Sequence, residues 1–269
     1  SWTFVGSVVY AAAQWGMLVV LTKLGSPEMV GLFALGLAIT MPILSFATLK
    51  TRLVQATDAR QTYQFGHYFG LRLLTTAVSL FVILLVVLVV GYEPDAALVI
   101  VAVGVSKAVE SISDVLYGLF QQRERMDMMA ISRVIKGPLS LIALGVTVYI
   151  TGSLLWGVIG LTLVWLLVLL AYDLPRCAML LGGNTLRSAV AALRPRWELR
   201  TLGQLAWLAL PLGVVVMLES LATNIPRYFI ERQAGVYLLG IFAAMAYLKR
   251  AGQTIIIALG LSAAPRLAQ

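Results

Sequence analysis

The sequence has little of the chemistry that most soluble enzymes use. It contains one cysteine, Cys177, and one histidine, His67. A single cysteine excludes an internal disulfide and a thiolate metal cluster, and a single histidine excludes a site built from several imidazoles. Glycine-rich phosphate loops and the GxSxG and HExxH patterns are also missing. We therefore expect no enzyme, no cofactor and no metal, and any energy coupling must use a gradient instead of bound ATP.

Charged residues are scarce as well. They make up 12% of the sequence, hydrophobic residues make up 60%, and the mean hydropathy is +0.92. A soluble domain carries about a quarter charged residues, so the solvent for most of this chain is lipid. The useful structural unit is then an apolar helix of about 20 residues, which crosses a hydrocarbon core about 30 Å thick. The apolar runs are continuous, which favours helices over strands of alternating hydrophobicity.

The expected fold is an all-α, polytopic transmembrane helical bundle of about eight spans. Four uncharged runs define five of these spans. The last run is long enough for two helices that turn at Gly152-Ser153. These runs cover residues 1–22, 29–49, 73–92 and 137–172. Three further spans carry charges and cover about 97–120, 204–229 and 236–260.

The chain divides into two unequal halves. We expect a first transmembrane bundle of six helices at 1–178, a basic cytoplasmic linker at 179–203 and the first two helices of a second bundle at 204–269. An offset of 209 residues superposes Gly31-Leu32-Phe33-Ala34 on Gly240-Ile241-Phe242-Ala243. Duplicated transporters show such faint internal similarity. About four further spans are therefore expected in the complete protein, and a true eight-span protein is the alternative.

Basic residues predict the orientation in the membrane. They cluster in alternate loops, whereas the turns Gly25–Glu28, Tyr92–Asp95 and Thr151–Ser153 contain no Lys or Arg. Because Lys and Arg accumulate in cytoplasmic loops, we expect a multi-pass plasma-membrane protein with a cytoplasmic N-terminus. The same rule explains the net charge of +8 without nucleic acid as a partner. The basic residues of these loops and their flanks are Lys50, Arg52, Arg60, Arg72, Arg123, Arg125, Arg133, Lys136, Arg176, Arg187, Arg194, Arg196 and Arg200.

The most informative charges are Lys107, Glu110 and Asp114 in the fourth span. At 100° per residue, Lys107 and Asp114 point within about 20° of each other, and Glu110 lies about 60° from Lys107. One charge near the bilayer centre costs about 2.5 to 3.5 kcal/mol even on a lenient scale, so this face must point into the protein or a hydrophilic cavity. Lys107 and Glu110 can neutralise each other, which leaves Asp114 in excess. A translocation cavity is favoured, and an ion pair that only fixes helix packing is the alternative.

Further candidates for the cavity lie in the last two spans: Glu219, Asn224, Arg227, Lys249 and Arg250. Two prolines interrupt the seventh span, which is tolerated where a membrane helix lines a cavity or packs on a neighbour. Arg227 lies near the outer end of that span, so snorkelling to the interface is its alternative role. Lys249 and Arg250 lie deeper and are candidates for a cationic patch that faces a pyrophosphate or a sugar acid.

Six short segments carry a resemblance to a known family. They are Leu53–Arg60, Glu110–Gln121, Arg123–Asp127, Asn224–Phe229, Leu239–Ala244 and Ala264–Leu267. In this order they resemble the oligosaccharide flippases of the Wzx type, which are polysaccharide biosynthesis proteins of the multidrug, oligosaccharidyl-lipid and polysaccharide exporter superfamily. Each segment is short, but together they are spread over most of the chain, from Leu53 to Leu267.

The resemblance implies two six-helix bundles and alternating access. The substrate would be a polyprenyl-pyrophosphate-linked oligosaccharide, moved from the cytoplasmic to the outer leaflet for a surface polymer such as lipopolysaccharide O-antigen or exopolysaccharide. Cationic groups would attract the pyrophosphate, and carboxylates would take part in coupling to H⁺ or Na⁺. The alternatives are a cation-coupled multidrug exporter, a non-transporting membrane scaffold and a membrane glycosyltransferase or polymerase, which the short outer turns disfavour.

Overall fold

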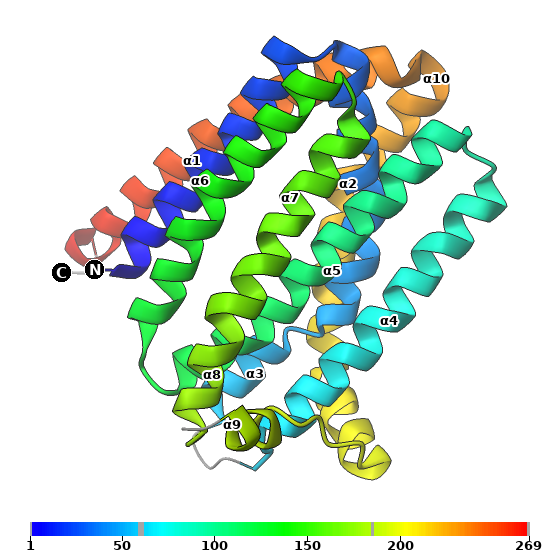
Figure 1. Cartoon of the computed structure of the whole chain (residues 1–269). Coiled ribbons are helices and arrows are strands. Elements are labelled where there is room, and N and C mark those ends of the chain that lie inside the picture. The colour runs from blue at the N-terminus through cyan, green and yellow to red at the C-terminus, as the bar shows by residue number, and fades with distance from the viewer. Residues whose placement is uncertain (1, 59–61, 184–185, 268–269) are drawn as a thin grey trace.

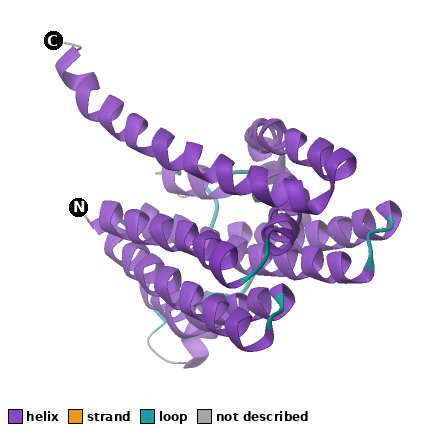
Figure 2. Ribbon diagram, turned by 90° about the horizontal axis from the view of Figure 1, so that it is seen from above, coloured by secondary structure: helices purple, strands orange, loops and turns teal. Residues whose placement is uncertain are grey.

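The computed structural model describes residues 2–58, 62–183 and 186–267, and the side chains of 4–58, 62–183, 187–188 and 190–246. Within these ranges the chain is helical and contains no strand. The elements in chain order are α1 (Trp2–Leu24), α2 (Pro27–Thr48), α3 (Thr51–Thr57), α4 (Phe65–Val90), α5 (Pro94–Gln122), α6 (Met126–Thr151), α7 (Leu154–Val168), the π-helical turn η1 (Leu169–Asp173), α8 (Leu174–Leu180), α9 (Leu186–Ala192) and α10 (Leu199–Leu267). Figure 2 shows these helices from above, joined by short loops.

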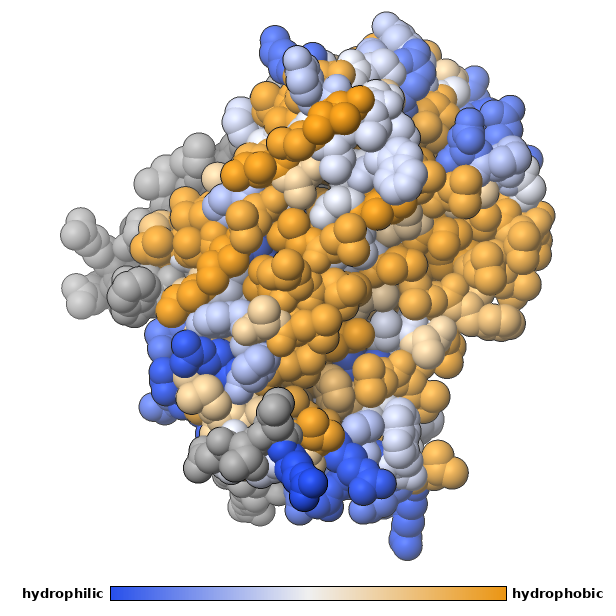
Figure 3. Space-filling view, in the orientation of Figure 1, coloured by the Kyte–Doolittle hydropathy of each residue, from blue (hydrophilic) through white to orange (hydrophobic). Residues whose placement is uncertain are grey.

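The helices have the length and composition of membrane spans. Among the described residues, seven stretches qualify: Phe4–Leu24, Pro27–Thr57, Phe65–Val90, Pro94–Gln122, Met126–Thr151, Leu154–Leu180 and Leu199–Ala246. Figure 3 shows the result as a broad apolar belt with hydrophilic residues gathered toward two ends. The expected all-α polytopic bundle is confirmed, and the chain has the architecture of a multi-pass membrane protein.

Eight spans were expected, and the difference comes from α10. α10 consists of two helices that meet at a kink at Gly235, whose φ of 80° and ψ of 172° are not helical. A side chain would be strained at this φ, so glycine permits the bend. The two arms of α10, 199–234 and 236–267, contain the expected spans 204–229 and 236–260. Figure 1 shows the first arm running along the bundle and the chain turning back near the α1–α2 loop.

Several helices extend beyond the uncharged runs. α4 begins at Phe65, before the expected 73, and α6 begins at Met126, before the expected 137. Arg72 and Lys136 therefore lie inside helices and are buried, at 1% and 4% exposure, instead of flanking loops. The sequence-based boundaries were wrong here because they assumed that a cation ends a span.

The loops segregate to the two ends of the bundle. The turns α1–α2, α4–α5 and α6–α7 share one end, and α3, α8 and α9 lie at the opposite end, which we call the basic end (Figure 1). Ser26 caps α2 by accepting from the Met29 N–H at 3.4 Å. Gly91 and Gly152 end α4 and α6 with φ of 72° and 61°. The turns without Lys or Arg therefore lie at the same end of the bundle, as the alternation of basic loops predicted.

α2 and the second arm of α10 cross at two glycines. A Cβ on Gly31 would lie 2.0 Å from the Val236 carbonyl oxygen, and a Cβ on Gly240 would lie 1.9 Å from the Pro27 carbonyl oxygen. Val236 and Gly240 follow Pro27 and Gly31 at the same offset of 209 residues. The contact is therefore reciprocal, which is the pattern that a twofold repeat requires. The division into two bundles stays a prediction.

Candidate functional site

A cavity of about 710 Å³ lies between α2, α3, α5 and the first arm of α10. We call it the charged cavity, because its wall includes six charged side chains: Lys50, Arg52, Lys107, Glu110, Asp114 and Glu219. Apolar residues of α2 and α10, such as Leu44 and Leu212, complete the wall. Charges within membrane helices are rare, and they pair or line a pathway where they occur. This cavity is therefore the candidate site.

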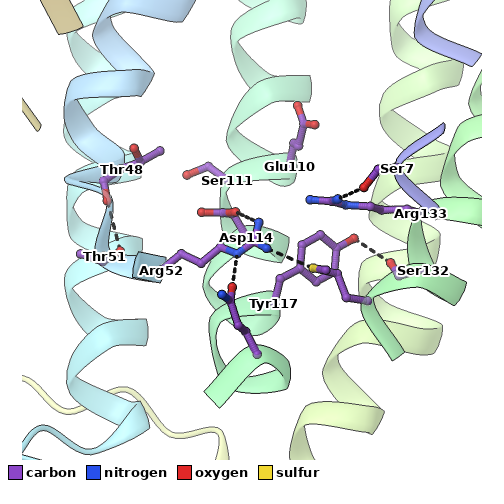
Figure 4. A network of polar contacts seen from close by, with 12 residues as sticks. Ser7, Thr48, Thr51, Arg52, Glu110, Ser111, Asp114, Tyr117, Ser132 and Arg133 are labelled. Carbon is purple, nitrogen blue, oxygen red and sulfur yellow. Dashed lines mark hydrogen bonds and ion pairs between the residues drawn. The ribbon is translucent and has the colours of Figure 1, made fainter. Parts of the chain in front are cut away.

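Asp114 is held by two arginines. Arg52 Nη1 lies 3.2 Å from Asp114 Oδ1 (Figure 4), and Arg72 Nη2 lies 3.5 Å from Oδ2. The buried Arg72 guanidinium also donates to Thr51 Oγ1 at 2.7 Å and to Ser111 Oγ at 3.2 Å. The sequence-based interpretation of Asp114 as an excess negative charge was therefore wrong, because cations from α3 and α4 neutralise it.

The chain reverses sharply at Leu49 and Lys50 to bring Arg52 to the cavity. Both residues adopt the left-handed conformation, with φ of 47° and 48°, which costs about 1 to 2 kcal/mol for each non-glycine residue. α3 then places Arg52 against α5 and α6, where it donates to Gln121 Oε1 at 3.3 Å and to Met129 Sδ at 3.1 Å. The Arg52 side chain keeps 24% of its surface exposed, so its guanidinium can still meet a ligand.

Glu110 forms the second charged group of the cavity. Lys107 Nζ lies 2.8 Å from Glu110 Oε2, as the i, i+3 spacing predicted. The Tyr10 hydroxyl donates to Glu110 Oε1 at 2.5 Å, and Lys107 Nζ also lies 5.0 Å from the centroid of the Trp165 ring. This carboxylate thus receives contacts from α1 and from its own helix. It remains 34% exposed as a side chain.

The structure brings four of the predicted site residues together and places the others elsewhere. Glu219 lines the cavity with Lys107, Glu110 and Asp114. Asn224 and Arg227 lie further along α10, are 4% and 5% exposed, and do not line it. Arg227 Nη1 donates to Asn224 Oδ1 at 3.0 Å, so burial replaces the snorkelling considered for Arg227. Lys249 and Arg250 lie outside the residues whose side chains are described.

Sequence reasoning missed a second buried ion pair. Lys136 Nζ lies 2.6 Å from Asp173 Oδ2, with side-chain exposures of 5% and 0%. Lys136 also donates to Ser113 Oγ at 2.6 Å and to the Tyr117 hydroxyl at 3.2 Å, while Ser132 donates to Asp173 Oδ1 at 2.6 Å. The pair joins α6 to the π-helical turn η1, outside the wall of the charged cavity.

A signal for the missed charged residues was present in the sequence. Arg72, Lys136 and Asp173 each stand next to a long uncharged run, so each could belong to a membrane helix that is longer than the run. Within the described ranges, no group of three or more His, Cys, Asp or Glu residues could hold a metal ion. The polar contacts among the described residues of the bundle include ion pairs, hydroxyl groups and the amides of Gln121 and Asn224.

Asp58, just beyond α3, fixes the loop that leads to α4. Its carboxylate accepts from the backbone N–H groups of Thr62 at 3.0 Å and Tyr63 at 3.1 Å, and from the Tyr68 hydroxyl at 3.2 Å. Burial opposes ionisation, but the hydrogen bonds from Thr62 and Tyr63 outweigh it and hold the pKa of the Asp58 carboxyl below its usual range. Asp58 belongs to the segment Leu53–Arg60 that the resemblance used, and its contacts are those of a loop anchor.

Comparison with known proteins gives one informative similarity. The chain is 28% identical over 247 residues to the capsular polysaccharide biosynthesis protein CapF of Staphylococcus aureus. The matched region covers 92% of this chain and 59% of CapF, so the chain spans less than two thirds of the length of this curated relative. No family model matches the chain, and no solved structure matches it.

Proposed function

We propose that this chain is part of a membrane transporter that moves a polyprenyl-pyrophosphate-linked oligosaccharide from the cytoplasmic to the outer leaflet by alternating access. The observation that carries the proposal is the charged cavity, a space of about 710 Å³ whose wall includes six charged side chains. The similarity to a capsular polysaccharide biosynthesis protein supports a role in polysaccharide synthesis. Because the chain spans 59% of that relative, the proposal concerns the complete protein.

Arg52 is the residue best placed to bind the pyrophosphate. Its planar guanidinium can donate two parallel hydrogen bonds to a phosphate, and its side chain is partly exposed to the cavity. A phosphate that displaces Asp114 from Arg52 does not leave a lone carboxylate, because Arg72 still lies 3.5 Å from Asp114. The substrate can therefore exchange with an internal counterion instead of meeting an empty cationic site.

Glu110 is the residue best placed for ion coupling. Protonation of its carboxyl removes the negative partner of Lys107, which lies 2.8 Å away. The cavity wall then gains a net positive charge, which favours an anionic substrate. In this scheme the basic end of the bundle faces the cytoplasm, in agreement with the positive-inside rule.

An exporter of organic cations is the second candidate, and Glu219 favours it. This carboxylate lines the cavity from α10 and makes no ion pair among the residues that the structure describes. An unpaired carboxylate on an apolar wall is suited to a hydrophobic cation. Such an exporter would lose activity in Glu219→Gln and keep it in Arg52→Gln, which is the reverse of the flippase expectation.

The test is leaflet-to-leaflet transfer of a fluorescent polyprenyl-pyrophosphate oligosaccharide in proteoliposomes that contain the complete protein. We expect transfer by the wild type and a loss of about tenfold or more in Arg52→Gln, because a charge-assisted bidentate contact disappears. Arg232→Gln, an exposed arginine of α10 outside the cavity, is the matched control and should transfer normally. Equal transfer by Arg52→Gln and the wild type would remove the cavity from the mechanism.

A further inference from the structure

A second cavity, of about 550 Å³, lies at the basic end where α4 begins and α5 ends. The segment around α9 covers it, and it shares no lining residue with the charged cavity. Its charged lining residues are Arg123, Arg194 and Arg196, and none of its lining residues is acidic. We call it the arginine pocket. Three cations around one concave space form a site for an anion.

The backbone that carries two of these arginines is fixed against α4. The Arg196 N–H donates to the Gly66 carbonyl oxygen at 2.9 Å. A Cβ on Gly66 would lie 2.9 Å from the Arg194 carbonyl oxygen, and a Cβ on Gly70 would lie 2.8 Å from the Arg196 carbonyl oxygen. The linker therefore approaches α4 as closely as two glycines allow, and Pro195 restricts the backbone between the arginines. The backbone positions of both arginines are therefore set before any ligand arrives.

The third arginine comes from a different helix. Arg123 caps the C-terminus of α5, where its N–H donates to the Leu119 carbonyl oxygen at 2.9 Å. The neighbouring Gln122 lines the pocket and donates to the Asp58 carbonyl oxygen at 3.2 Å, which fixes this end of α5 to the loop before α4. Within the described part of the chain, the side chains of Arg123, Arg194 and Arg196 make no hydrogen bond and no ion pair. All three guanidinium groups can therefore donate hydrogen bonds to a ligand in the pocket.

The pocket also has apolar and neutral polar walls. Phe65, Leu119 and Leu181 line one part of it, and Tyr63, Gln64 and Gln122 supply hydroxyl and amide groups. It lies at the end of two membrane-spanning helices, where the apolar belt meets water. Because membrane-spanning helices end at the headgroup layer, we expect this pocket to be reached from the bilayer surface as well as from the aqueous phase.

We propose that the arginine pocket binds a phosphate group, separately from the transported substrate. A guanidinium group binds phosphate through two parallel hydrogen bonds. The several oxygens of a phosphate can accept from more than one arginine at once, so a phosphate suits a pocket with three arginines. The phosphate belongs either to the headgroup of an anionic phospholipid or to a free phosphate compound in solution. The proposal does not depend on the transport function, because it concerns another cavity and is tested by binding.

The site also has a structural consequence. Arg123 ends α5 in the first bundle, whereas Arg194 and Arg196 precede α10, which begins at Leu199. A phosphate held by all three joins the end of the first bundle to the segment that leads into the second. We therefore expect occupancy to raise the thermal stability of the complete protein, as ligand binding to the folded state does.

The experiment compares Arg194→Gln/Arg196→Gln with the control Arg187→Gln/Arg200→Gln. The control removes two exposed arginines on either side of the pocket segment, one in α9 and one at the start of α10, that do not line the pocket. Both variants therefore lose equal charge. The purified complete protein is tested with two phosphate probes. In nanodiscs, binding of dioleoylphosphatidylglycerol is compared with binding of dioleoylphosphatidylcholine. In detergent, the probe is sodium pyrophosphate. Binding is measured by native mass spectrometry and thermal shift.

We expect the affinity for at least one phosphate probe to fall about tenfold or more in the pocket variant and to stay unchanged in the control. Arg123→Gln, on another helix, should weaken the same probe. Preference for phosphatidylglycerol that pyrophosphate does not compete away identifies a lipid headgroup, and tight pyrophosphate binding in detergent identifies a free phosphate compound. Equal binding by the pocket variant and the control, for both probes, would overturn the proposal.

Discussion

Lys136 and Asp173 show how single residues keep charge inside this bundle. Their side chains are 5% and 0% exposed and lie 2.6 Å apart, and Ser113, Tyr117 and Ser132 complete their hydrogen bonding. Removing two charges from water is costly, so such a pair is stable only when both partners are present and satisfied. The pair therefore acts as a unit, and its net contribution to stability is obtained only when both partners are replaced.

Lys136→Met alone should lower the free energy of unfolding by about 3 to 5 kcal/mol, because Asp173 is left buried without its partner. The double variant Lys136→Met/Asp173→Leu should lose clearly less than the sum of the two single variants. Unfolding of the detergent-solubilised protein measures both effects. Lys23→Met, at the exposed end of α1, is the control and should be close to wild type. Additive losses in the double variant would show that the two residues act independently.

Asp58 predicts a pH dependence outside the membrane. Its pKa is held below the usual value because hydrogen bonds from Thr62 and Tyr63 outweigh the effect of burial. A carboxyl with a lowered folded-state pKa contributes stability above its unfolded pKa of about 3.9 and loses it as the pH falls through the folded-state pKa. The melting-temperature advantage of wild type over Asp58→Asn should therefore be constant near neutral pH and shrink below about pH 4. If the melting-temperature difference between wild type and Asp58→Asn did not change on acidification, the ionised Asp58 carboxylate would not be the group that stabilises this loop.

At the scale of the helices, the sequence alone predicted the all-α class, the approximate positions of the spans and the grouping at one end of the turns without Lys or Arg. It predicted the Lys107–Glu110 pair because both residues lie on one helix at a fixed spacing. It could not predict that Arg52 and Arg72 reach Asp114, because α3, α4 and α5 meet only through tertiary packing. The span boundaries failed at Arg72 and Lys136 because these cations find partners inside the bundle and so need no contact with water.

The crossing of α2 and α10 depends on two small residues. Gly31→Ala would place its Cβ 2.0 Å from the Val236 carbonyl oxygen, where backbone must move. We expect a loss of about 1 to 3 kcal/mol from overpacking, with Gly240→Ala giving a similar loss at the same contact. Gly203→Ala has open space around it and should be neutral or slightly stabilising, because alanine favours the helix by up to about 1 kcal/mol. Thermal unfolding of the three variants checks the order, and equal stability of Gly31→Ala and Gly203→Ala would contradict it.

At the scale of the whole molecule, the charged cavity gives the bundle a polar interior between α2, α5 and the first arm of α10. Arg52 and Lys107 on its wall are held by Asp114 and Glu110, so the bundle keeps most of this charge as ion pairs within an apolar belt. The proposed transport requires this cavity to hold water and to admit a phosphate-bearing substrate. An ion-paired core that serves only packing requires neither.

The most direct test is the water accessibility of the cavity in the complete protein. Ser45→Cys lies on the cavity wall, Val78→Cys lies on the 54% exposed outer face of α4 toward lipid, and the native Cys177 is fully buried. A membrane-impermeant maleimide should label Ser45→Cys and leave Val78→Cys and Cys177 unlabelled, because thiol alkylation needs the thiolate in water. A polyprenyl-pyrophosphate oligosaccharide should slow the labelling of Ser45→Cys. Labelling of Ser45→Cys no faster than that of Val78→Cys would contradict the account, since the cavity would then be closed to water and to substrate.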